Sequence, residues 1–148
     1  SSNYNNFNNK IIAYPISLDE KMLISKLNIN KNRFGASGHS FSRSIDSKGK
    51  IFHPSCIQGS ISKSFDEFVD ETKIVPDYVK IDVDGNELKV INGMKKTLSL
   101  KKIKSILIEL NNSFDEHTKI KIFLKNEGYV CVYGENINKN SSNYIFNL

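Results

Sequence analysis

The chain has little of what marks several classes of protein. It contains two cysteines, three prolines and no tryptophan in 148 residues, so a disulfide-rich scaffold and a collagen-like repeat are excluded. No apolar run approaches the ~20 residues of a membrane-spanning helix, and no membrane association is expected. Cys56 and Cys131 stand far apart without a CxxC pair. This pattern predicts free thiols in a reducing compartment, the cytoplasm.

What is present is the composition of one compact domain. Hydrophobic residues make up 39% of the chain and charged residues 25%, which is typical of a globular protein and disfavours wholesale disorder. Residues 1–148 are therefore expected to form one domain. The asparagine-rich segment Ser1–Lys10 lacks the apolar core of a signal peptide, and the missing initiator methionine suggests a fragment.

The positive charge comes from scattered lysines. The formal net charge is +5, and only Lys95, Lys96, Lys101, Lys102 and Lys104 approach a cluster. A nucleic-acid surface gathers Lys and Arg on one face and interleaves aromatic residues for stacking. A short lysine run is more typical of a solvated helix end, so no nucleic-acid partner is expected.

Capped helix starts alternate with apolar segments along the chain. Three tetrapeptides, beginning at Ser64, Asp84 and Ser113, place a short oxygen-bearing side chain three residues ahead of a glutamate, the capping-box pattern. The second predicted helix carries one apolar stripe of Leu88, Ile91, Met94 and Leu98. Strands are expected at 10–18, 51–61, 77–83, 104–110, 128–133 and 143–148, with a flexible Gly/Ser/Asn-rich loop at about 28–50. This order predicts an α/β fold with a mostly parallel sheet and an antiparallel terminal strand.

Acidic residues stand where two predicted strands end. Asp82 and Asp84 end the first strongly apolar strand, and Glu109 ends the next. Ligands of open α/β sheets bind at the carboxyl ends of the parallel strands, so these carboxylates could accept a hydroxyl proton or hold a hard cation. Asp84 is equally well explained as a helix N-cap. Asp82 and Glu109 have no such structural role, and a carboxylate ending a buried strand costs free energy unless it is paired.

Other chemistry has little support in the sequence. Gly85 is expected to serve the strand-to-helix turn. His39, His53 and His117 share no metal-ligand spacing, so no metal site is expected and each histidine is assigned to the surface. The chain has no GxSxG elbow, Walker loop or GxGxxG. Hydrolase, nucleoside triphosphatase and dehydrogenase activities therefore lack a motif.

The segment 76–93 resembles a family signature. Its residues 80–87 read KIDVDGNE, which resembles the K-I-D-V-E-G-x-E of FkbM-type methyltransferases with Asp84 in place of a glutamate. An apolar helix and a glycine, Gly93, follow as in the family. Ser64–Phe68 is similar to the family's helix start, Ile106–Leu110 to its next strand and Gly128–Tyr129 to a later turn.

The resemblance implies a fold and a reaction. The fold would be a Rossmann-like class I methyltransferase fold, partial here, because the family's Gly-rich donor-binding turn lies upstream of Ser1. The methyl donor would be S-adenosylmethionine, and the acceptor a small molecule with a hydroxyl group, a saccharide being one candidate. Asp82 and Glu109 would be catalytic, and Asp84, Gly85 and Glu87 would bind the cofactor. The alternative is a non-catalytic α/β remnant or binding module without donor binding.

Overall fold

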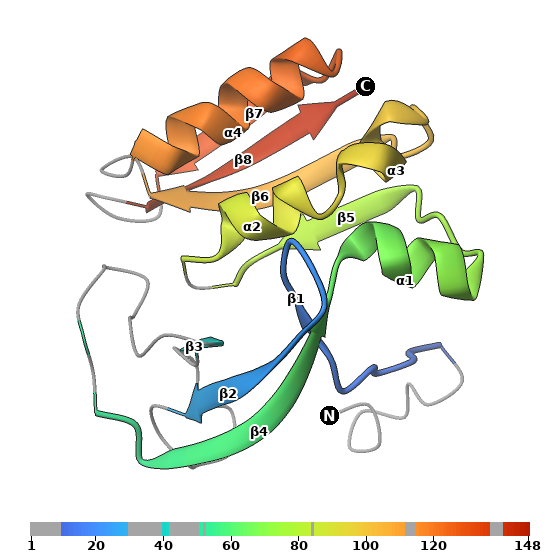
Figure 1. The fold of residues 1–148 in the computed structure, drawn as a ribbon. Coiled ribbons are helices and arrows are strands. Elements are labelled where there is room, and N and C mark those ends of the chain that lie inside the picture. Colours follow the sequence, from blue (N-terminus) through green and yellow to red (C-terminus); the bar gives the residue numbers. More distant parts are fainter. Residues whose placement is uncertain are drawn as a thin grey trace.

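The described part of the chain forms two four-stranded sheets with helices between and beside their strands (Figure 1). The computed structural model describes residues 10–29, 40–41, 51, 53–83, 85–111, 115–136 and 141–148. The architecture is α/β, as predicted. Most of the loop predicted at about 28–50 lies outside the described residues.

The first sheet has the strand order β1-β4-β2-β3. Its strands are β1 (Ser17–Leu18), β2 (Leu23–Ile29), β3 (Ser40–Phe41) and β4 (Cys56–Lys63). β1 runs parallel to β4, whereas β2 is antiparallel to both β3 and β4. The strand predicted at 10–18 is confined to β1, which begins after Pro15, because proline has no N–H for the ladder.

The second sheet has the order β5-β6-β8-β7 and carries the core. Its strands are β5 (Tyr78–Ile81), β6 (Ser105–Asn111), β7 (Val130–Asn136) and β8 (Ser141–Asn147). β5 is parallel to β6, and β8 is antiparallel to both β6 and β7. The predicted parallel neighbours and the antiparallel terminal strand are confirmed.

The prediction of a mostly parallel sheet is wrong, because both sheets are mixed. In the described part of each sheet, one pairing is parallel and two are antiparallel. The reason is the length of the connections. β7 and β8 are joined by four residues, and a connection this short can only join antiparallel strands, since a parallel pair needs a crossover of a dozen residues or more.

Four helices occur in the described part of the chain: α1 (Phe65–Thr72), α2 (Glu87–Asn92), α3 (Lys95–Ser99) and α4 (Asp115–Asn126). The capping box predicted at Ser64 is confirmed, since its side chain accepts from the Glu67 N–H and the Glu67 carboxylate accepts from the Ser64 N–H. The box predicted at Asp84 is wrong in position: α2 begins at Glu87 with Asn86 as N-cap. Asp84 and Ser113 lie outside the described residues.

The second predicted helix is broken in two at Gly93. A Cβ atom on Gly93 would lie 2.4 Å from the backbone oxygen of Asp19, in the turn between β1 and β2. The Asp19 side chain is buried and forms an ion pair with Lys89 of α2 at 3.5 Å. Close contact with the first sheet therefore explains both the break and the glycine.

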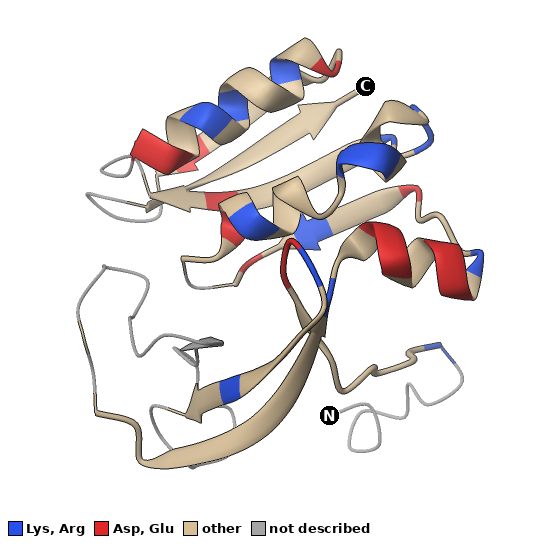
Figure 2. Ribbon diagram, in the orientation of Figure 1, with Lys and Arg blue, Asp and Glu red and all other residues tan. Residues whose placement is uncertain are grey.

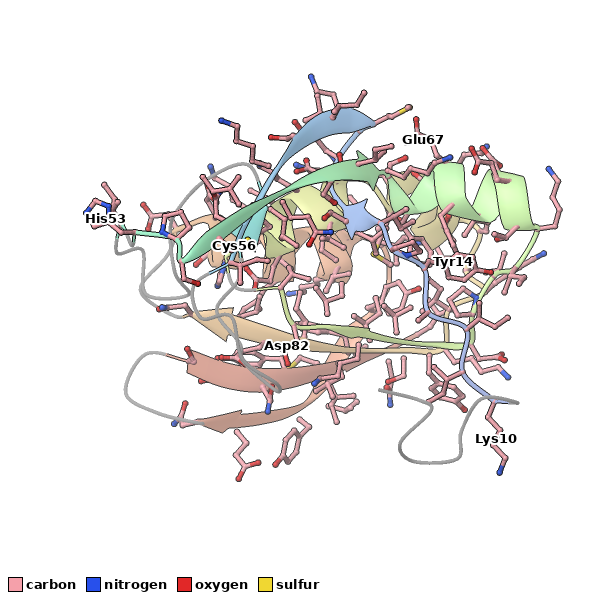
Figure 3. All side chains as sticks on the ribbon, turned by 90° about the horizontal axis from the view of Figure 1, so that it is seen from below. Lys10, Tyr14, His53, Cys56, Glu67 and Asp82 are labelled. Carbon is pink, nitrogen blue, oxygen red and sulfur yellow. The ribbon has the colours of Figure 1, made fainter. Side chains whose placement is uncertain are left out.

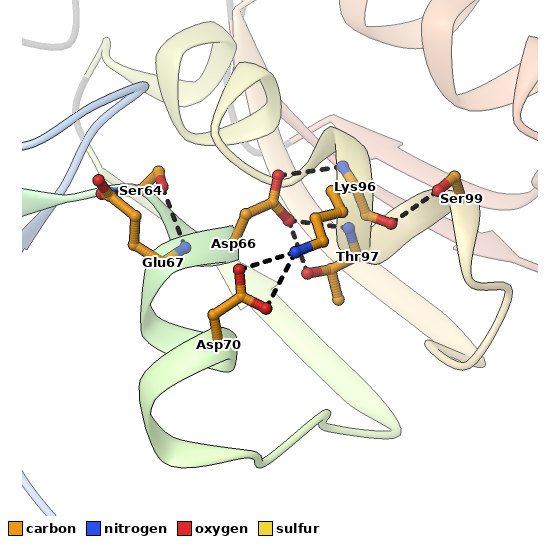
Figure 4. A network of polar contacts seen from close by, with 7 residues as sticks. All are labelled: Ser64, Asp66, Glu67, Asp70, Lys96, Thr97 and Ser99. Carbon is orange, nitrogen blue, oxygen red and sulfur yellow. Dashed lines mark hydrogen bonds and ion pairs between the residues drawn. The ribbon is translucent and has the colours of Figure 1, made fainter.

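The second part of the broken helix, α3, is capped from another helix. Asp66 of α1 accepts hydrogen bonds from the Lys96 N–H at 3.0 Å, the Thr97 N–H at 2.8 Å and the Thr97 hydroxyl at 2.6 Å (Figure 4). The N-cap residue of α3, Met94, makes no side-chain cap hydrogen bond. Asp66 thus satisfies backbone donors that a helix start leaves unpaired.

Helices α2, α3 and α4 lie against one face of the second sheet and bury the core with it (Figure 1). From β6, alternate residues Ile106, Ile108 and Leu110 are fully buried, as expected for one face of a strand. The helices contribute Val90, Ile91, Met94, Leu98, Ile120 and Leu124 to the same cluster. No helix in the described part of the chain is long and apolar enough to cross a membrane.

Charged residues of both signs occur along the ribbon (Figure 2). Three of the clustered lysines form ion pairs: Lys96 with Asp70, Lys101 with Glu127 and Lys104 with Asp77. Carboxylates therefore neutralise most of the positive charge of this lysine cluster.

Candidate active site at the carboxyl ends of β5 and β6

A small pocket opens where the two parallel strands end. β5 and β6 pair in register, with Ile81 opposite Ile108, so the next residues, Asp82 and Glu109, reach the same rim. The pocket has a volume of about 10 Å³ and is lined by Asp82, Gly85, Glu87, Glu109, Asn111, His117 and Ser141. The prediction that Asp82 and Glu109 share one rim is confirmed. Asp84 lies outside the described residues.

Asp82 stands at the open side of this pocket. Its side chain is 46% exposed, and Oδ2 accepts a hydrogen bond from the Lys80 ammonium at 2.9 Å. This hydrogen bond raises the pKa of Lys80, and the more distant Glu109 adds to the effect. Asp82 is thus a solvent-exposed carboxylate paired with a lysine. Because it is not buried, the free-energy cost of burying a carboxylate that the sequence analysis expected does not apply to it.

Glu109 comes from the middle strand of the sheet. It is half-buried and alternates with the fully buried Ile108 and Leu110, which point into the core. Asn143 of β8 lies opposite Glu109 in the register. Glu109 is consequently held on a rigid strand, with a carboxylate that reaches the pocket.

Glu87 lies deeper in the pocket and closes the turn between β5 and α2. Glu87 is 4% exposed, and its Oε1 accepts a hydrogen bond from the Gly85 N–H at 3.1 Å. Gly85 has φ 95°, a conformation that side chains with a Cβ rarely adopt. The predicted turn role of Gly85 is therefore supported by its backbone, and Glu87 fixes that turn from inside.

His117 is the site residue that the sequence reasoning missed. It was assigned to the surface, but it is 5% exposed, and the assignment is wrong. The Asn111 N–H donates to Nδ1 at 2.5 Å, so the hydrogen of the neutral ring sits on Nε2. Nε2 lies 3.3 Å from Glu87 Oε2. The ring therefore links α4 to the end of β6 and to the start of α2.

Of the described histidines, only His117 lines the pocket. His53 is exposed at the periphery, as expected (Figure 3). His39 lies outside the described residues. In the part of the chain that the structure describes, no group of three or more His, Cys, Asp and Glu side chains is arranged to hold a metal ion.

Fold and site together define the class of protein. A pocket lined by carboxylates at the carboxyl ends of parallel strands, with a glycine turn leading into a helix, is the usual site of an α/β enzyme domain. The family model of the methyltransferase FkbM domain matches residues 5–131. The chain belongs to this methyltransferase family, which confirms the resemblance drawn from the signature. No curated protein and no solved structure matches the chain.

Proposed function

We propose that the protein transfers a methyl group from S-adenosylmethionine to a hydroxyl group of a sugar or another small metabolite. Membership of the FkbM methyltransferase family supports methyl transfer. The observation that carries the choice of a hydroxyl acceptor is the pocket that Asp82 and Glu109 share at the ends of β5 and β6. A hydroxyl must lose its proton when it is methylated, and a carboxylate can take that proton.

The proposed reaction is an in-line displacement. The acceptor oxygen forms a bond to the methyl carbon as the bond from that carbon to the sulfonium sulfur breaks, and the hydroxyl proton passes to a carboxylate. Holding the reactants in contact supplies much of the acceleration. Asp82 is the first candidate for the base because it is open to solvent, and Glu109 is the second. Lys80 would hold the Asp82 carboxylate in one orientation.

Membership of the methyltransferase family also supports a proposal about the fold. We take residues 1–148 as one domain and as part of a Rossmann-like class I methyltransferase fold. β8 pairs antiparallel with β6 on one side and β7 on the other, so β5, β6 and β7 all run in one direction. The signature residues Asp84, Gly85 and Glu87 would then lie beside the donor.

The two cysteines are free and exposed, which favours a reducing compartment, the cytoplasm.

A transfer assay tests this function. The protein as its gene encodes it would be incubated with methyl-labelled S-adenosylmethionine and a panel of sugars and small hydroxyl metabolites. We expect label in at least one acceptor, and we expect Asp82→Asn to lower turnover by roughly 100-fold while the thermal melt is unchanged. Glu109→Gln is assayed in parallel.

The matched control for Asp82 is Asp70→Asn. Asp70 also forms an exposed ion pair with a lysine, Lys96, but it lies on α1, outside the residues that line the pocket. Turnover should be unaffected. If Asp82→Asn unfolds the protein or leaves turnover unchanged, Asp82 is structural and Glu109 takes the proposed role. Binding of ligands without any transfer would instead favour the non-catalytic binding module.

A further inference from the structure

Glu87 has an oxygen atom that no group in the described structure satisfies. Its Oε1 is held by the Gly85 N–H, whereas Oε2 is buried and has no hydrogen-bond partner. His117 Nε2 lies 3.3 Å away, but without the geometry of a hydrogen bond. A buried polar atom without a partner destabilises the folded protein, so a ligand is expected to hydrogen-bond to Oε2.

The space beside Oε2 limits that ligand to one small molecule. The pocket volume of about 10 Å³ is near the minimum that holds a single water molecule. Its walls are polar, with Glu87 and His117 inside and Asp82 and Glu109 toward the rim. A water in a polar cavity of this size needs two to four polar partners, and the pocket offers that number.

His117 cannot serve as the base in this arrangement. The lone pair of Nδ1 is engaged by the Asn111 N–H, and Nε2 already carries the hydrogen of the neutral ring. Glu87 is different, because its Oε2 has free lone pairs. A buried ionised carboxylate with one oxygen unpaired is costly, and a proton on Oε2 would remove that charge.

We propose that the pocket binds one water molecule and that Glu87 takes up, through this water, the proton released when the acceptor hydroxyl is methylated. The proposal rests on the proposed methyl transfer, and it names Glu87 in place of Asp82 or Glu109 as the carboxylate that finally holds the proton. In one step the acceptor O–H bond breaks, the oxygen bonds to the methyl carbon, and the sulfonium becomes a neutral thioether. The water receives the hydroxyl proton and passes one of its own to Oε2, so the water is regenerated and the carboxylate becomes a neutral acid. His117 positions Glu87.

Two measurements test the proposal separately from the proposed function. A crystal structure at high resolution should show a water within hydrogen-bonding distance of Glu87 Oε2 in the wild-type protein. A dry pocket overturns the water site, whether or not the protein transfers methyl groups. A wild-type protein with the water but without transfer to any acceptor overturns the proposed function, and the proton role of Glu87 falls with it.

Kinetics test the proton role. In single-turnover assays, Glu87→Gln should lower the transfer rate at least 100-fold with little change in acceptor KM, since the amide cannot take up the proton. Glu116→Gln, an exposed neighbour of His117 on α4, is the control and should keep the wild-type rate. An unchanged rate in Glu87→Gln overturns the proposal.

A wild-type readout covers the case in which Glu87→Gln fails to fold. Single-turnover rates are measured in mixtures of light and heavy water. Two protons in motion, one from the hydroxyl and one from the water, make the rate fall along a curve as the deuterium fraction rises. A straight line or no isotope effect overturns transfer through the water.

Discussion

Tyr129 shows how one buried hydroxyl is satisfied in this protein. The residue is 1% exposed, and its hydroxyl donates to the Ile103 carbonyl at 2.9 Å. Burial raises the pKa of the phenol, and the nearby Glu127 carboxylate raises it further. The unfolded chain releases this proton at its ordinary pKa of 10.0, while the folded chain still holds it. The free energy of unfolding therefore falls as the pH rises above that value.

The variant Tyr129→Phe tests both effects. Loss of the hydroxyl leaves the Ile103 carbonyl without this donor and should cost about 1 kcal/mol of stability at neutral pH. The difference between wild type and variant should shrink above the ordinary pKa of tyrosine, because the variant has no phenol to titrate. Urea unfolding across an alkaline pH series measures it. Tyr78→Phe, at a residue 71% exposed, should change neither quantity.

At the scale of single residues, the sequence supported part of the site. The carboxylates Asp82 and Glu109 could be predicted because they follow apolar strands, and parallel strands end at one rim. The spacing of His117 from the other histidines carries no metal-ligand pattern, so it gave no sign of the site. A second signal was present: His117, Ile120 and Leu124 stand three and four residues apart, the spacing of one helix face, and all three are buried.

At the scale of elements, the junction of α1 and α3 depends on Asp66. We expect Asp66→Ala to lower the free energy of unfolding by about 1 to 2 kcal/mol, because the first backbone N–H groups of α3 lose their acceptor. Asp66→Asn should cost less, since asparagine caps almost as well. Chemical denaturation measures both variants. Asp70→Ala removes only the exposed pair with Lys96 and should have little effect; equal losses at both positions would contradict the capping role.

The contact between α2 and the first sheet gives a second prediction. Gly93→Ala places a methyl group 2.4 Å from the Asp19 backbone oxygen, so the backbone must shift, at a cost of about 1 to 3 kcal/mol. Gly59→Ala is the control, because a Cβ on Gly59 would meet nothing within 4 Å. Thermal melts should show a lower midpoint for Gly93→Ala alone. Equal midpoints would mean that the α2 contact is loose.

Strand β2 and the helix break at Gly93 could not be predicted, because neither leaves a clear local pattern in the sequence. In β2 the apolar residues Ile24 and Leu27 fall on opposite faces of the strand, and its one buried residue is the polar Asn28, so no apolar alternation marks it. The helix break at Gly93 comes from a contact with Asp19, seventy-four residues earlier in the chain, which no local pattern contains. By contrast, β5, β6 and the β7–β8 hairpin could be predicted, because burial and a short connection leave plain local signals.

At the scale of the whole molecule, we expect these 148 residues alone to bind S-adenosylmethionine weakly or not at all. The resemblance implies that a Gly-rich turn holds the donor, and the sequence contains no GxGxxG. The pocket at the rim, at about 10 Å³, is also far too small for a nucleoside. Isothermal titration calorimetry measures the affinity. A micromolar dissociation constant would mean that the donor site is built differently from the family's.

The outer edge of β5 affects the self-association of this protein. In the described structure the second sheet ends at β5, which pairs with β6 on its other side. Backbone groups along such an edge can accept a further strand, and Tyr78 beside it is 71% exposed. Where no strand of its own or of a partner covers this edge, concentrated solutions of the chain should become turbid through strand-to-strand association, and adding charge to the edge should delay the turbidity.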